Sequence, residues 1–321
     1  MELFTNVNVD WLGKKWYFLG FSLIFSVAGL LSIFFWHGIP KGVDFKGGTL
    51  VYVMFDQQPN EDHIHAAMDA AGLHDATVQR ISTGALTASS REEVISLPQS
   101  DTSELALDAG RANVLNALTA NYHDSSFSIQ QVEVVGPQVG KQLTHQAELA
   151  TLYSLAGMLI YLWFRFELIY GVAAVVAVFH DTLITIGAFS LTNQEITLTV
   201  IAAILTLIGY SMNDTIVVFD RIRENLRTMR RESLSVVVNH SINQTLSRTI
   251  LTSGLTFLTV LSLYLFGGEV LHGFSFALVV GILIGTYSSI AVAAPMLVAY
   301  QDWRASRGKA ATLPSGKKAR A

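Results

Sequence analysis

TLTVIAAILTLIGYSMNDTIVVFDRIREN, at residues 197–225, sets the class of structure that this chain can adopt. The run is apolar for long enough to cross a bilayer, yet it contains Tyr210, Ser211, Asn213 and Asp214. A charged side chain at the centre of a membrane helix costs about 2.5 to 3.5 kcal/mol on insertion scales. We therefore expect Asp214 to face a protein or water interior, either as a functional group or as a structural acid bonded to a neighbouring helix.

The composition is that of a membrane protein. Of the 321 residues, 51% are hydrophobic and only 14% are charged, whereas soluble proteins average about 25% charged residues. The chain has no cysteine, which excludes disulfides and thiolate metal sites. It also lacks nucleotide-binding and HExxH metal motifs. We expect no enzymatic activity, no cofactor, no bound metal and no nucleic-acid partner.

Six apolar runs predict a polytopic α-helical membrane protein with six transmembrane helices. Lys14 and Lys15 precede the first run, so residues 1–15 are expected in the cytoplasm. That run is expected to be a retained anchor, because WHGIPKG follows it instead of the small-residue cleavage site of a signal peptide. The expected spans are 16–36, 149–164, 168–191, the apolar part of 197–225, 249–266 and 274–300, the last five within a membrane region at 142–300.

Two segments that follow spans are basic. Five arginines fall between residues 221 and 231, which predicts a cytoplasmic basic loop at 220–247. The tail at 301–321 is polar and basic, and we expect it to be cytoplasmic and disordered. Both termini are therefore predicted to lie in the cytoplasm.

Residues 37–141 contain no run that could span a membrane, and their pattern is that of a folded soluble domain. The order βαββαβ predicts a small α+β ferredoxin-like domain, inserted between helices 1 and 2, with both helices on one face of an antiparallel sheet. It would lie across the membrane from the N-terminus, in the periplasm. Strands are expected at 50–55, 76–82, 93–97 and 127–135, helices at 61–71 and 103–121, a linker at 84–90, and a helix cap at Asp101 or Thr102.

GVDFKGGT, at residues 42–49, is expected to form a tight turn into the first strand of this domain. Gly47 and Gly48 suit positive φ angles, and Asp44 precedes them. The segment lacks the longer pattern of a phosphate-binding loop. From its residues alone, it is best interpreted as a structural turn.

Polar residues repeat at helical spacing in the fourth and fifth spans. Thr206, Tyr210 and Asp214 form one stripe, with Ser211 and Asn213 beside it; Gln244, Arg248 and Thr252 form the other. In a hairpin with equal arms, residue 231 lies midway between Asp214 and Arg248, so these two would lie at similar depth. The pair is either a proton-binding site or a plain buried salt bridge. Both remain open because burial raises the pKa of a carboxyl group in general, whereas a nearby arginine lowers it.

Two further patterns lie in the third and sixth spans. His180 and Asp181 form a second polar site, for which a satisfied helix contact is favoured over a proton relay. The sixth span has a small residue at every fourth position, which predicts a close-packing helix face. Its members are Gly273, Ala277, Gly281, Gly285, Ser289 and Ala293.

Three motifs in order resemble the SecD/SecF protein-export family, a branch of the resistance-nodulation-division (RND) transporter superfamily. They are GVDFKGGT at 42–49, IGYSMNDTIVVFDRIREN at 208–225 and NQTLSRTILTS at 243–253. The resemblance is to the smaller, SecF-type members. It implies that Asp214 and Arg248 take part in proton movement, with Tyr210, Ser211, Asn213 and Gln244 as a supporting polar stripe.

The resemblance also implies partners and a location. A SecF-type chain would sit in the bacterial inner membrane, pair with SecD, associate with the SecYEG translocon and promote translocation of preproteins, driven by the proton motive force. The alternative is an RND-like proton-driven exporter of small molecules or lipids. An intramembrane protease using Asp181 and Asp214 is disfavoured, because the GxGD pattern is absent and Arg248 would have no role.

Overall fold

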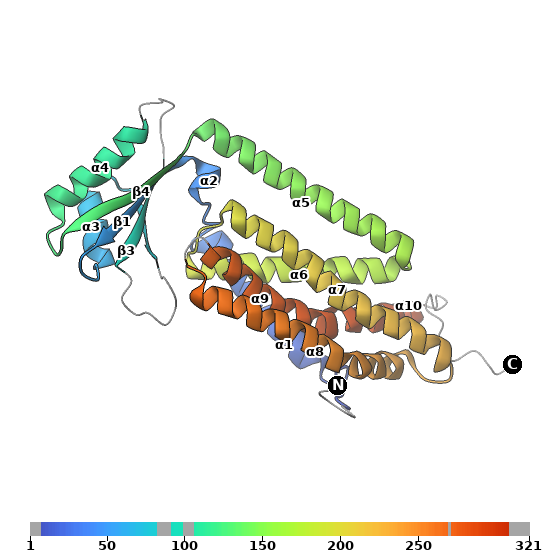
Figure 1. The fold of residues 1–321 in the computed structure, drawn as a ribbon. Helices are drawn as coiled ribbons and strands as arrows, with labels where there is room; N and C mark the ends of the chain where they lie inside the picture. Colours follow the sequence, from blue (N-terminus) through green and yellow to red (C-terminus); the bar gives the residue numbers. More distant parts are fainter. Residues whose placement is uncertain (1–7, 82–90, 99–105, 269–270, 308–321) are drawn as a thin grey trace.

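A computed structural model describes residues 8–81, 91–98, 106–268 and 271–307. A small sheet domain lies at one end of a bundle of long helices (Figure 1). The expected linker at 84–90 and the expected cap at Asp101 or Thr102 lie outside the described residues. The same holds for residues 1–7 and 308–321.

In the described residues, five helical segments are long and apolar enough to cross a membrane. The chain is therefore a membrane protein with several apolar helices. These segments are α1 (Lys15–Phe35), α6 (Leu168–Thr192), α7 (Leu198–Thr228), α8 (Leu234–Phe266), and α9 (His272–Ser288), which continues through the π-helical η2 (Ser289–Ala293) into α10 (Ala294–Ser306).

The second expected span, at 149–164, is not among these five segments. It forms the second half of a longer helix, α5 (Pro137–Arg165). The first half of α5 is polar, with Lys141, His145 and Glu148, so its apolar part is shorter than the roughly 20 residues that usually span a bilayer.

The basic segment at 220–247, expected as a loop, is almost entirely helical. Helix α7 ends at Thr228 and α8 begins at Leu234, so the turn is confined to 229–233, around the predicted midpoint at residue 231. The two helices extend beyond the apolar region because they bury a shared seam there, in which Asn225 donates hydrogen bonds to Ser241 and Gln244. Residues 301–306 of the expected disordered tail likewise belong to α10.

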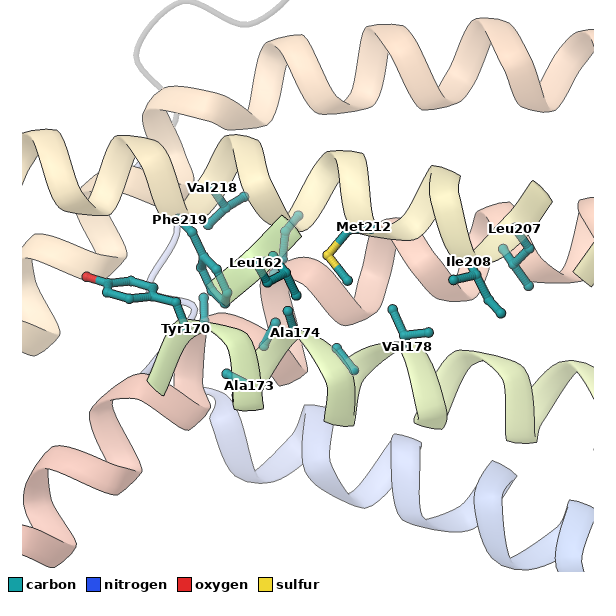
Figure 2. Packing of buried hydrophobic residues seen from close by; sticks show 14 of the residues in the cluster. Leu162, Tyr170, Ala173, Ala174, Val178, Leu207, Ile208, Met212, Val218 and Phe219 are labelled. Atoms are coloured by element: carbon teal, nitrogen blue, oxygen red, sulfur yellow. The ribbon is translucent and has the colours of Figure 1, made fainter. Parts of the chain in front are cut away.

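Helices α6 and α7 form the centre of the bundle core, which Figure 2 shows from close by. The rings of Tyr170 on α6 and Phe219 on α7 meet edge to face with centroids 5.2 Å apart. Leu162, from the end of α5, packs into the same cluster and is 1% exposed. Through this contact, the expected span at 149–164 packs against the other helices.

Small residues let helix backbones approach closely at two interfaces. The sixth-span stripe packs against α7 as predicted: a Cβ atom on Gly281 would lie 2.4 Å from Leu207, and one on Gly285 would lie 3.0 Å from Ser211. At the second interface, between α1 and α6, a Cβ atom on Gly29 would lie 3.0 Å from the Cα atom of Gly187. The bundle therefore depends on glycine at these crossings.

The sheet domain has the predicted order of elements. Strands β1 (Gly48–Phe55), β2 (Thr77–Ile81), β3 (Glu92–Pro98) and β4 (Phe127–Val135) pair antiparallel in the order β2-β3-β1-β4. Helices α3 (Glu61–Ala70) and α4 (Ala106–Asn121) pack on one face of the sheet, where Val51 and Ile95 lie opposite each other and are fully buried. The other face turns toward the bundle.

Substitution of Gly29 by leucine should destabilise the bundle, because the added side chain has no room at the crossing with Gly187. Overpacking of this kind costs typically about 1 to 3 kcal/mol. Gly20 lies on the same helix with nothing within 4 Å of an added Cβ atom, so Gly20→Leu is the matched control. Thermal denaturation in lipid nanodiscs compares the two; equal melting temperatures would contradict the close crossing.

Candidate functional site

The GVDFKGGT turn positions the start of α7, the helix that carries Asp214. Residues 43–46 form the short helix α2 (Val43–Lys46), and Gly47 leaves it with φ of 76°, a conformation that suits glycine. Strand β1 begins at Gly48, two residues before the expected start at residue 50, so the segment leads into the first strand of the domain. The carboxylate of Asp44 accepts a hydrogen bond from the backbone N–H of Leu198 at 2.9 Å, and so satisfies a free donor at the N-terminus of α7. The turn therefore has a tertiary role that its own residues did not predict.

Asp214 is buried between α7 and α8. Asp214 is only 3% exposed, and its Oδ2 accepts a hydrogen bond of 2.7 Å from Ser253 Oγ on α8. In the described part of the chain, Asp214 has no ion pair. A hydroxyl group, and not a cation, therefore makes the direct contact with this acid.

Arg248 lies near Asp214 without touching it. Its charge acts electrostatically on the Asp214 carboxyl group, but the arginine residue itself is exposed on the outside of α8. Ser253 lies five residues further along α8 than Arg248, which corresponds to about 7.5 Å of helix. The hydrogen bond therefore places Asp214 at the depth of Ser253. The expected depth was that of Arg248, which lies more than one helical turn away along α8.

Asp181 on α6 has more hydrogen-bond donors around it than Asp214. It is 1% exposed, and its Oδ2 accepts hydrogen bonds from Ser211 Oγ on α7 at 2.5 Å and from Ser288 Oγ on α9 at 2.7 Å. Its Oδ1 pairs with His180 Nδ1 at 2.9 Å. Asp181 therefore joins three helices, whereas the Nε2 atom of His180 is buried with no hydrogen-bond partner among the described residues.

The predicted polar stripe does not form a single group. Ser211 contacts Asp181 rather than Asp214, and Asn213 is exposed on the surface of the chain. Tyr210 is half-buried, and its hydroxyl oxygen is buried with no hydrogen-bond partner among the described residues. Gln244 accepts a hydrogen bond from Asn225 and lies in the seam between α7 and α8 near the 229–233 turn. Helical spacing alone could not predict which neighbouring helix each of these side chains faces.

The sequence reasoning missed the hydroxyl groups that complete the site. Ser253 and Ser288 bind the two acids, and Thr215 pairs with Ser289 at 2.8 Å where η2 begins. A π-helical turn shifts the side chains that follow it and often occurs at functional sites. The adjacent serines at 288 and 289, in an otherwise apolar span, were the available signal.

The chemistry of this arrangement is that of two buried carboxyl groups in contact with hydroxyl groups. A serine or threonine hydroxyl both donates and accepts, so it can stay bonded to an acid in either protonation state. The described residues contain no group of acids and histidines that could hold a metal ion.

The two acids should respond differently to conversion to asparagine. In Asp181→Asn, an NH2 group replaces one of the two carboxylate oxygens, each of which now takes part in a hydrogen bond. A buried group left without a partner costs about 1 to 3 kcal/mol. In Asp214→Asn the amide oxygen still accepts from Ser253, so we expect a smaller loss. Melting temperatures of the purified variants in nanodiscs test this order. Equal losses would show that the hydrogen bonds to Asp181 do not contribute more to stability.

Comparison with known proteins bears on this site directly. The family model "Protein export membrane protein SecD/SecF, C-terminal" matches residues 114–303, which include both acids and Arg248, and the model "SecD/SecF GG Motif" matches residues 34–59, which include the α2 turn. A protein translocase subunit SecF from Koribacter versatilis is 56% identical, and the match covers 97% of this chain and 96% of the relative. One from Calditerrivibrio nitroreducens is 41% identical over 95% of this chain and 98% of its own length.

A crystal structure of SecDF, described as a translocon-associated membrane protein from Thermus thermophilus, has a similar fold, with a TM-score of 0.80 and 34% identity. The match covers 92% of this chain but only 39% of that longer chain. By the family models and by these near full-length relatives, the chain belongs to the SecD/SecF family of protein export membrane proteins.

Proposed function

We propose that this chain is a SecF-type accessory subunit, which couples the proton motive force to the translocation of preproteins. The observation that carries the proposal is Asp214, an acid buried within a membrane helix and bonded to a hydroxyl group instead of a cation. Moving one elementary charge through 100 mV is worth about 2.3 kcal/mol. A proton that reaches Asp214 therefore brings enough free energy to change the packing of neighbouring helices.

Arg248 supports this role through its charge. An arginine stays protonated in proteins, so it acts on the acid and does not carry the proton itself. Because Arg248 is close enough to influence Asp214 but is not paired with it, a small movement of α8 relative to α7 changes the stability of the ionised acid. We propose that Asp181 and His180 form a structural contact beside this relay.

The exposed polar face of α7 and α8 supports a partner within the membrane. Asn213 and Arg248 are exposed on this face in the isolated chain. A bare arginine against lipid is costly, so another protein is expected to cover it. We propose that SecD does so, since the similar solved structure is named SecDF and is more than twice as long as the matched region. SecYEG and the translocating preprotein are the further partners that we propose.

The arrangement of the helices supports a proposed topology in the bacterial inner membrane. The end of the bundle far from the sheet domain is rich in arginine: Arg165 pairs with Asp220 at 2.9 Å there, and the turn at 229–233 adds Arg230 and Arg231. Positive charge favours the cytoplasmic side. We propose that both termini lie on that side and that α5, with 29 residues, also spans the membrane, which makes six transmembrane helices.

We propose that the sheet domain is a ferredoxin-like periplasmic domain. Its order of elements, its antiparallel pairing β2-β3-β1-β4 and the placement of α3 and α4 on one face support this assignment. The alternative of an independent small-molecule exporter has no specific support, because the chain has one small domain and the family is one of protein export.

Replacement of Asp214 by asparagine, and separately of Arg248 by methionine, should abolish most of the stimulation of secretion by the proton motive force. The first change removes the titrating group, and the second removes the charge that acts on it. Asp220→Asn and Arg231→Met are matched controls at the basic end of the bundle. Secretion is measured in inner-membrane vesicles with and without a potential, at equal protein level. Unchanged stimulation in both variants would contradict the relay.

The topology is tested by single cysteines, since the chain has none of its own. Ala70 on α3 and Ser235 near the start of α8 are both exposed. In intact spheroplasts, a membrane-impermeant maleimide should label Ala70→Cys, and it should label Ser235→Cys only after the membrane is broken. The reverse pattern would contradict the proposed orientation.

A further inference from the structure

The sheet domain meets the helical bundle at the turn between α6 and α7, residues 193–197. The linker that follows α1 is held to this turn by backbone hydrogen bonds. The N–H of Gly42 donates to the carbonyl of Ile196 at 2.9 Å, and the N–H of Ile196 donates to the carbonyl of Pro40 at 2.7 Å. This linker therefore belongs to the bundle side of the junction.

A side-chain hydrogen bond connects the sheet itself to the same turn. Thr77, the first residue of the edge strand β2, donates from Oγ1 to Glu195 Oε1 at 3.2 Å. Glu195 also lies close to the linker, since a Cβ atom on Gly42 would be 3.4 Å from its Oε2. Glu195 is thus in contact with both sides of the junction.

The remainder of the sheet is separated from the bundle by a cavity of about 560 Å³. Leu50, Val94 and Ser96 line it from the open face of the sheet, and Thr199 and Gly273 line it from the ends of α7 and α9. The open face therefore does not pack closely on the helices. The Thr77–Glu195 hydrogen bond is one of the contacts that hold the domain in its docked orientation.

The surroundings of Glu195 make it sensitive to protons. Burial raises the pKa of its carboxyl group above the ordinary value, Asp44 adds to the rise, and the Thr77 hydrogen bond and Lys46 oppose it. A small cavity of about 20 Å³ adjoins Glu195, which is room for about one water molecule. The charged and titratable groups that line the two cavities beside Glu195 are Lys41, Lys46, Asp75, Asp44, Tyr52, Glu61, Glu133 and His272.

We propose that Glu195 is a proton-binding residue at the outer end of the bundle, and that its protonation favours the docked orientation of the sheet domain. The inference rests on the proposed function, in which the sheet domain faces the periplasm. It adds to Asp214 a second proton site on the side from which protons enter. Proton uptake there and the position of the domain are thereby linked.

The direction of the effect follows from linkage. When the domain undocks, Glu195 becomes exposed and its pKa returns toward the ordinary value; when it is docked, the pKa is raised. At Glu195 the docked state therefore binds more protons, so this residue favours docking at low pH, and its contribution weakens as the pH rises through the docked pKa. The proton motive force acidifies the outer side, which favours docking.

The test uses two cysteines in the cysteine-free full chain, Ala70→Cys on α3 and Leu191→Cys on α6, both at exposed positions. With spin labels attached, the distance distribution in lipid nanodiscs is measured over a pH series. We expect the docked population to fall as the pH rises, with a midpoint above the ordinary glutamate pKa. Glu195→Gln, neutral at every pH, should stay docked throughout the series.

Glu133→Gln is the matched control, because Glu133 lines the larger cavity from β4 and accepts its hydrogen bond from Gln131 on the same strand; it should keep the original pH response. The inference is overturned if the distances do not change with pH, or if Glu195→Gln changes with pH as the original chain does. No export occurs in this measurement. Its failure is therefore distinct from failure of the Asp214 secretion test.

Discussion

A carboxyl group inside a membrane must be matched by hydrogen-bond donors, and this requirement organises the helical bundle. Asp181 is matched by Ser211, Ser288 and His180, and Asp214 by Ser253. Each acid therefore fixes the rotation of the helices that supply its donors, because a rotated helix would leave a buried charge or hydroxyl unsatisfied. The small residues of α9 then let these polar groups approach closely enough to bond.

The two acids divide this work unequally. Asp181 holds α6, α7 and α9 together with several donors and is suited to a stable structural contact. Within the part of the chain that the structure describes, Asp214 accepts one side-chain hydrogen bond, and the charge of Arg248 acts on it from nearby without an ion pair. An acid with few fixed partners changes its protonation state with less disturbance of the structure. This difference favours Asp214 as the acid that responds to protons.

The sequence predicted the elements well because their signals are local. The sheet domain, the helix hairpin around residue 231 and the packing stripe of α9 all follow from periodicity and turn residues. The partners of the acids could not be predicted in this way, because tertiary packing chooses which of many serines and threonines meets Asp181 or Asp214. The hydrogen bond from the N–H of Leu198 to Asp44, at the N-terminus of α7, could not be predicted for the same reason, since the two residues lie far apart in the chain.

Helix α7 connects the outer junction to the buried acid. It begins at Leu198, where Asp44 caps it, directly after the turn that holds Glu195, and Asp214 lies 16 residues later, about 24 Å along the helix. Coupling between distant sites requires an element whose arrangement both sites bias. Because α7 is one continuous helix, a shift of its capped end also moves Asp214 relative to Ser253 and Arg248. The sheet domain and the membrane acid therefore share one mechanical element, and each is placed to influence the other through it.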